Sequence, residues 1–149
     1  MNQLSNNFYL IEFTRSQTAI RKGIDNQPNT PEIQNLIRLC NAVLQPLRVA
    51  LGFPIHISSG YRCPFLNAAI GGARSSQHQY GKAADVDHPT KNKEIFDYIK
   101  NYLTFDQLIW EFGNKERPDW VHVSYDTQNR GQVLKAFRDE KGKTKYEEI

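Results

Sequence analysis

The chain centres on one stretch, Ser76-Gln77-His78-Gln79-Tyr80-Gly81-Lys82-Ala83-Ala84-Asp85. It places a histidine and an aspartate seven residues apart among small and turn-forming residues. A second histidine follows in Asp119-Trp120-Val121-His122-Val123-Ser124, whose alternation is typical of a β-strand. Two histidines, one carboxylate ligand and one spare carboxylate are the parts of a hydrolytic zinc site. We therefore expect the rest of the chain to be the frame that brings these two segments together.

The expected metal ligands are His78 from a loop, Asp85 from the strand that follows it, and His122 from a later strand. Zinc in hydrolytic sites takes three such ligands, keeps one position for water, and lowers the pKa of that water. A nearby carboxylate then accepts the proton. Asp119 lies at the start of the strand that carries His122, where local twist could aim it at this water.

Other interpretations of these residues stay open on the sequence alone. A single histidine in a soluble protein is more often a surface or hydrogen-bonded residue than a ligand. Asp87 shares a strand face with the aspartate ligand and His88 is adjacent, so a shifted ligand set is conceivable. Glu111 could replace Asp119 as the base if its strand comes to the cleft. His56, on a core strand, is expected to be hydrogen-bonded or exposed at the strand's end.

Apolar periodicity, caps and glycine stops predict the secondary structure. The predicted helices cover residues 15–22, 31–50 with a bend near Pro46, 63–70 and 91–103. The predicted strands cover residues 55–58, 83–87, 105–112, 120–125 and 132–137, and residues 8–13 are an edge strand or an extended lead-in. Because helices come mostly first and antiparallel strands mostly later, the expected fold class is α+β, with helices packed on a small antiparallel sheet.

The length of 149 residues favours a single domain, residues 1–149, that is large enough to bury a core. Its motif-bearing core covers about residues 55–125. Residues 138–149 are mostly charged, and we expect a hairpin arm or a fraying tail there.

Composition argues against several classes of partner. A formal net charge of +3 without a basic arm or a recognition motif gives no support for nucleic-acid binding. No apolar run approaches the length of a membrane span, and the N-terminus lacks a secretory signal. We therefore expect a monomer that is made in the cytoplasm and reaches any extracellular target by another route. Cys40 and Cys63 make no disulfide framework and are expected to be free thiols.

The two motifs together resemble those of the zinc D,D-peptidase family, which is peptidase M15-like. The family includes D-alanyl-D-alanine carboxypeptidases, dipeptidases and phage L-alanyl-D-glutamate endopeptidases, and it shares a fold with the hedgehog signalling domain. The resemblance rests on the pattern Ser76-x-His78-x-x-Gly81-x-Ala83-x-Asp85 and on an acid-x-x-His at Asp119–His122. The segments Ser58–Arg62 and His122–Ser124 extend it, so that it spans about residues 55–125.

The resemblance implies roles for individual residues. His78, Asp85 and His122 would be the zinc ligands, and Asp119 the general base, where many members have glutamate. Aspartate is one methylene shorter, so the backbone must bring it closer to the metal. Arg62 would hold a substrate carboxylate or the developing oxyanion. Without the family, Arg62 would be interpreted as a surface arginine or part of a structural ion pair.

The implied function is zinc-dependent hydrolysis of an amide bond in the peptidoglycan stem peptide, as a carboxypeptidase or an endopeptidase. The missing secretory signal favours a phage or prophage lysin. A non-catalytic cell-wall-binding domain that keeps the fold is the alternative, supported by the departure at Asp119. Four aromatic residues either line a peptide groove or belong to the core: Tyr61, Tyr80, Trp110 and Trp120.

Overall fold

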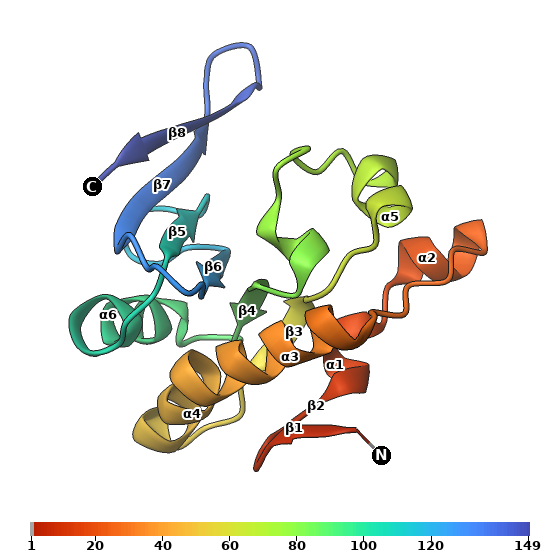
Figure 1. The fold of residues 1–149 in the computed structure, drawn as a ribbon. Helices are drawn as coiled ribbons and strands as arrows, with labels where there is room; N and C mark the ends of the chain where they lie inside the picture. Colours follow the sequence, from red (N-terminus) through yellow and green to blue (C-terminus); the bar gives the residue numbers. More distant parts are fainter. Residues whose placement is uncertain (1) are drawn as a thin grey trace.

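A six-stranded mixed sheet carries most of the residues that the sequence singles out. The computed structural model describes residues 2–149, and Figure 1 shows its elements. The strands lie in the order β3 (His56–Ser59), β4 (Ala83–Asp87), β6 (Trp120–Ser124), β5 (Gln107–Glu111), β7 (Gln132–Arg138) and β8 (Thr144–Glu148). Only β5 and β7 pair in parallel; the other neighbours are antiparallel. With the helices, the sheet confirms the α+β class.

Most of the helices lie in the N-terminal half of the chain, and the last two follow in the other half. In chain order, the helices are α1 (Leu10–Thr14), α2 (Gln17–Lys22), α3 (Thr30–Leu39), the π-helical turn η1 (Cys40–Leu44), α4 (Gln45–Leu51), α5 (Pro64–Ala69), the 3-10 turn η2 (Gln77–Tyr80) and α6 (Asn92–Tyr102). A short hairpin of β1 (Gln3–Ser5) and β2 (Phe8–Tyr9) precedes them. Among residues 2–149, no helix combines the length and the apolar character that a membrane crossing needs.

The long helix predicted over residues 31–50 is present but interrupted. Asn29 and Glu32 form a capping box at its start, and Gly52 ends it in the left-handed conformation with φ 75°. The π-helical turn η1 stands just ahead of Pro46. Proline has no N–H to donate to the carbonyl four residues earlier, which explains why the regular ladder breaks there.

The prediction of an edge strand or an extended lead-in over residues 8–13 is wrong for most of its length. Only Phe8–Tyr9 pair with β1, and α1 begins at Leu10. The carboxylate of Glu12 accepts a hydrogen bond of 2.7 Å from the backbone N–H of Tyr9 and so caps this short helix. The helix predicted over residues 15–22 is α2, and its cap is Ser16, whose hydroxyl accepts from the N–H of Ala19.

Strand alternation gives the sheet two different faces. Leu108, Val121 and Val123 are fully buried and belong to the hydrophobic core with residues of α3, η1, α4 and α6. His122 alternates with these valines and therefore points to the opposite face. That opposite face is the floor of the cleft described below.

The hairpin of β7 and β8 projects from the far edge of the sheet (Figure 1). Its register pairs Leu134 with Glu148 and Arg138 with Thr144. Residues 138–149 thus contain a strand, and the projecting arm is a hairpin that stands beside the cleft.

Candidate metal centre

Three buried side chains, His78, Asp85 and His122, bring their ligand atoms within 4.8 Å of one another. Asp85 Oδ1 lies 3.4 Å from His78 Nε2 and 3.1 Å from His122 Nδ1. Two ligands bound at about 2.0 Å in a tetrahedral zinc site are separated by about 3.3 Å. The residues present therefore fit a small tetrahedral cation.

Sheet register holds two of the three groups. Asp85 on β4 is the direct partner of His122 on β6, so both side chains leave the same face of the sheet. His122 turns its Nδ1 toward Asp85, while its Nε2 is buried without a hydrogen-bond partner in residues 2–149. A cation held at Nδ1 fits this ring orientation.

The third group, His78, is held by the loop that precedes β4. Its Nδ1 lies 2.7 Å from the carbonyl oxygen of Gly60, so Nδ1 carries the proton and Nε2 is free to bind a metal. The hydroxyl of Ser76 accepts from the N–H of His78 and caps the turn. Gly81 closes it with φ 71°, and a Cβ there would lie 2.3 Å from the carbonyl oxygen of Glu32. Only glycine fits this close approach of the loop to α3.

The electrostatics of the cluster favour an ionised Asp85. Burial opposes its charge, but His78 and His122 hold the pKa of the Asp85 carboxyl well below its usual range. An ionised carboxylate beside two imidazole nitrogens is the state that a metal ligand requires.

Arg62 lies against the other oxygen of the aspartate. Its Nη2 donates to Asp85 Oδ2 at 3.3 Å, its Nε to Ser59 Oγ at 3.0 Å and its Nη1 to Asn67 Oδ1 at 3.2 Å. Gly72 stands beside this group, where a Cβ would lie 2.1 Å from Asn67 Oδ1. Arg62 thus lines the cleft and also orients Asp85 through an ion pair.

The two candidate bases lie in different places. Glu111 ends β5 opposite Trp120, lines the cleft of the metal cluster and is buried. Burial raises the pKa of the Glu111 carboxyl to about 7. Asp119 is exposed and lines a second cavity of about 590 Å³ with Lys115 and Lys135. Only its backbone meets Glu111, through an N–H···O bond of 2.9 Å.

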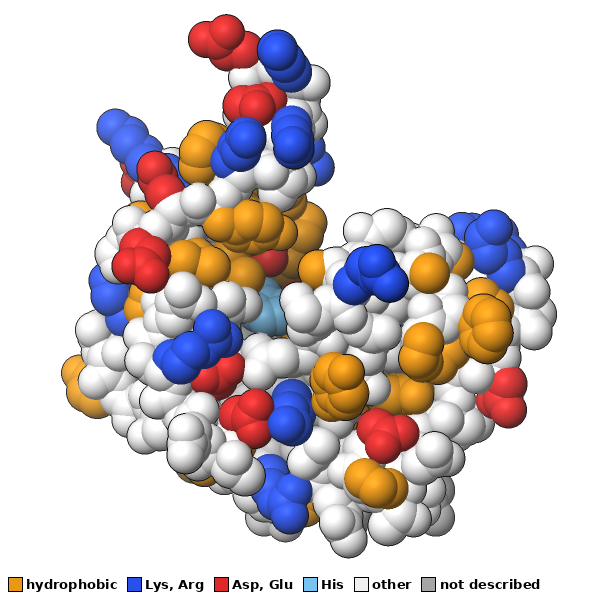
Figure 2. Space-filling view, turned by 45° about the horizontal axis from the view of Figure 1, so that its top comes forward, with side chains coloured by type: hydrophobic (Ala, Val, Ile, Leu, Met, Phe, Trp, Pro, Cys, Tyr) orange, Lys and Arg blue, Asp and Glu red, His pale blue; other side chains and the backbone are white. Residues whose placement is uncertain are grey.

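The cleft above the cluster has a volume of about 1250 Å³. One wall comes from residues 70–78, and the other from β5, the loop of residues 126–130 and the β7–β8 hairpin. Figure 2 shows histidine surface at the bottom of a hollow beside the projecting hairpin. Such a cleft is open enough to admit an extended peptide.

The shifted ligand set that the sequence left open does not assemble. Within residues 2–149, His78, Asp85 and His122 are the one group of ligands close enough to share a metal ion. The carboxylate of Asp87 instead accepts a hydrogen bond from His56 Nδ1 at 2.9 Å. His88 stacks on Phe53 with ring centroids 4.6 Å apart. Of the four aromatic residues, Trp120 lines the cleft, Tyr61 and Trp110 belong to the core, and Tyr80 is exposed.

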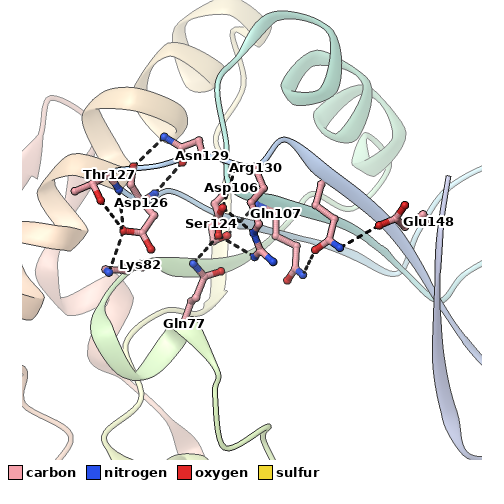
Figure 3. Close-up of polar contacts among 11 residues, drawn as sticks. Gln77, Lys82, Asp106, Gln107, Ser124, Asp126, Thr127, Asn129, Arg130 and Glu148 are labelled. Carbon is pink, nitrogen blue, oxygen red and sulfur yellow. Dashed lines mark hydrogen bonds and ion pairs between the residues drawn. The ribbon is translucent and has the colours of Figure 1, made fainter.

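Polar contacts that the sequence does not reveal tie the loop that carries His78 to the sheet (Figure 3). Asp106 is buried just before β5 and accepts from Gln77 Nε2 at 2.8 Å and from Arg130 Nη2 at 2.9 Å. Nearby, Lys82 pairs with Asp126 at 3.0 Å. Gln77 directly precedes His78, so these contacts help to fix the loop that holds the third ligand. Residues so far apart in the chain carry no spacing signal that could have revealed the contact.

A comparison with protein-family models matches residues 6–124 to peptidase M15. The chain belongs to the peptidase M15 family. The match includes all three residues of the metal cluster, Arg62 and Glu111, and it confirms the resemblance read from the motifs. Among curated proteins, no match was found. Membership supports a metallopeptidase, and hence a hydrolase that acts on a peptide substrate. The β7–β8 hairpin lies outside the matched residues.

Proposed function

We propose that this M15 peptidase holds one zinc ion at His78, Asp85 and His122 and hydrolyses an amide bond in the peptidoglycan stem peptide. The observation that carries the proposal is the convergence of the three ligand atoms on the floor of an open cleft that also contains Glu111. The choice of peptidoglycan rests on the motif resemblance. When bound, zinc would supply the Lewis acidity that polarises the scissile carbonyl and acidifies the attacking water.

We further propose Glu111 as the general base. Its carboxylate lies in the cleft of the cluster, and a pKa near 7 suits a group that must take up a proton and then return it. In this role Glu111 accepts the proton of the attacking water and passes it to the leaving amine. Asp119 is the competing candidate, supported by the acid-x-x-His motif. Against it stand the exposure of its side chain and its place at a different cavity.

Arg62 is proposed to act in two ways. Through Asp85 Oδ2 it orients a metal ligand, as outer-sphere partners of metal sites do. Three of its five N–H groups donate to Ser59, Asn67 and Asp85, which leaves donors for a carboxylate or a developing oxyanion in the cleft.

The biological setting proposed is that of a phage or prophage lysin that acts on the cell wall. We propose a monomer as the active form, because one chain supplies all the residues of the site. Whether the enzyme trims a terminal D-alanine or cuts inside the stem depends on which substrate groups the cleft walls bind.

Mass spectrometry of muropeptides digested by the zinc-loaded protein tests this function. The expected products differ from the substrate by one hydrolysed peptide bond, and their masses identify that bond. Products that differ only in sugar linkages would refute a peptidase. A zinc-loaded protein that binds wall but leaves every muropeptide intact would instead support a non-catalytic wall-binding domain.

A further inference from the structure

The cleft contains an arginine that the proposed catalytic machinery does not use. Three arginines line it: Arg62, Arg130 and Arg138. Arg62 is paired with Asp85, and Arg130 with Asp106. Within residues 2–149, Arg138 has no carboxylate within ion-pair distance. Its guanidinium is therefore free to bind an anion that enters the cleft.

Arg138 is also held in place by an aromatic platform. Its Cζ lies 4.0 Å from the centroid of the Phe112 ring, a distance typical of a cation–π contact. Phe112 in turn packs on Trp120, with ring centroids 5.5 Å apart. Stacking of this kind holds the planar guanidinium while its edge donors stay available.

The backbone of Phe112, the residue on which Arg138 packs, is strained. Phe112 has φ 56°, and it is the one non-glycine residue with positive φ in the described part of the chain. Such a conformation is unfavourable for a residue with a Cβ. A hydrogen bond of 3.1 Å from its N–H to the carbonyl oxygen of Ala136 holds it there. Strain that places a ring at the wall of a cleft indicates a functional constraint.

A tyrosine on the same hairpin stands near this arginine. Tyr146 on β8 pairs with Ala136 on β7, which pairs in turn with Glu111 on β5. Ala136 is small and fully buried, so it leaves room for the ring of Tyr146 to lie on the cleft side of this row. The hydroxyl of Tyr146 has no hydrogen-bond partner in residues 2–149, and the side chain is exposed. Arg138 and Tyr146 thus offer charged and neutral donors on one wall.

We propose that the β7–β8 hairpin is the carboxylate-binding wall of the substrate cleft, with Arg138 as the residue that binds a carboxylate of the peptide and Tyr146 beside it. This inference deepens the proposed function and rests on it for the identity of the peptide. A peptidoglycan stem carries carboxylates at its D-glutamate and at its C-terminus. The wall would select for one of them and so determine which bond lies over the metal cluster.

The test measures binding rather than cleavage, so that it is independent of catalysis. The protein is the full zinc-loaded chain with Glu111→Gln and Asp119→Asn together, in which neither candidate base can act. Isothermal titration gives Kd for the pentapeptide L-Ala-D-Glu-L-Lys-D-Ala-D-Ala and for two versions with one carboxylate converted to an amide, at D-Glu or at the C-terminus. The same three peptides are then titrated into Arg138→Gln in that background.

One of the two amidations is expected to weaken binding about tenfold to a hundredfold when Arg138 is present, since a charged hydrogen bond is lost. The same amidation should change Kd less than about twofold in Arg138→Gln, because its partner is already absent. Lys145→Gln is the matched control: it removes one positive charge from the hairpin at a residue that does not line the cleft, so the discrimination should persist.

Two results would overturn the inference: equal discrimination with and without Arg138, or no measurable binding of any of the three peptides. Failure of the proposed function would give a different experimental result from failure of this inference. A parent chain that digests no muropeptide, while Arg138 still discriminates between acid and amide, would refute the peptidase and leave the carboxylate-binding wall standing.

Discussion

Asp85 and His122 are direct partners across β4 and β6, and Asp85 Oδ1 lies 3.1 Å from His122 Nδ1. Two of the three proposed metal ligands are therefore positioned by sheet register, in which a slip of one residue would turn one of these side chains into the core. The third, His78, is positioned by a loop whose histidine is held by the Gly60 carbonyl. The sheet register and the capped turn together hold the three side chains of the candidate metal centre close to one another.

Zinc binding should depend on these residues and not on other histidines. Elemental analysis should find about one zinc per chain in the parent, and His78→Ala and His122→Ala should each lose most of it. His56→Ala is the matched control, because His56 lies on neighbouring β3, is exposed and pairs with Asp87. Undiminished zinc in both ligand variants would refute the ligand set.

Metal removal should lower thermal stability, since an ion that binds only the folded chain stabilises it by mass action. At free zinc about 100 times Kd, the gain is about 2.7 kcal/mol, or a rise in Tm of roughly 5–10 °C for a domain of this size. Calorimetry with and without chelator measures it. The shift should vanish in His122→Ala, and a chelator effect of equal size in that variant would place the metal elsewhere.

Stability of the zinc-free protein should fall as pH rises from about 4.5 to about 7. Burial raises the pKa of Glu111 from 4.5 to about 7, so between these values the folded state binds more protons than the unfolded state. This contribution to the free energy of unfolding is fully present below about pH 4.5 and is lost as pH approaches 7; its size is at most about 3 kcal/mol.

Urea unfolding at several pH values, compared between the parent and Glu111→Gln, isolates this effect. Glutamine does not titrate, so the variant should lose this part of the pH dependence. An identical slope between pH 4.5 and 7 in both proteins would show that Glu111 titrates normally.

The loop that carries His78 should tolerate no side chain at Gly81. Both Gly81→Ala and Gly23→Ala must adopt positive φ, but a Cβ at Gly23 meets nothing within 4 Å. Gly23→Ala should therefore cost about 1–2 kcal/mol in urea unfolding from φ alone. Gly81→Ala should cost clearly more, because its Cβ would lie 2.3 Å from the Glu32 carbonyl oxygen, and it should also weaken zinc binding. Equal losses would show that the contact with α3 is unimportant.

Much of the fold and the metal cluster could be predicted because the signals are local. The strand near residues 56–59 follows from the alternating run Ile55–Ser58, and the helix end at Gly52 from a glycine stop. The parallel pairing of β5 with β7 could not be predicted, since pairing partners leave no trace in the periodicity of either strand. Likewise, Phe8–Phe13 has a strand-like composition, and the cap from Glu12 decides for a helix.

The identity of the general base likewise depends on strand pairing that the sequence does not reveal. A spacing of three between Asp119 and His122 suggests proximity in a motif, yet Asp119 lies just before β6, and its exposed side chain lines a different cavity. Glu111 lies opposite Trp120, which shares the face of His122 by even spacing. This relation appears only once β5 and β6 are known to pair in this register. The role of Asp119 stays a prediction from the resemblance, and Glu111 is our proposal.

The most direct measurement compares muropeptide cleavage by the zinc-loaded parent, Glu111→Gln and Asp119→Asn, with zinc content determined for each. We predict that Glu111→Gln loses about 10²- to 10⁴-fold in kcat at unchanged zinc content, the range expected when a general base is removed. Asp119→Asn should stay within a few-fold of the parent. Full activity of Glu111→Gln, with loss in Asp119→Asn, would contradict a peptidase that uses Glu111 as its base.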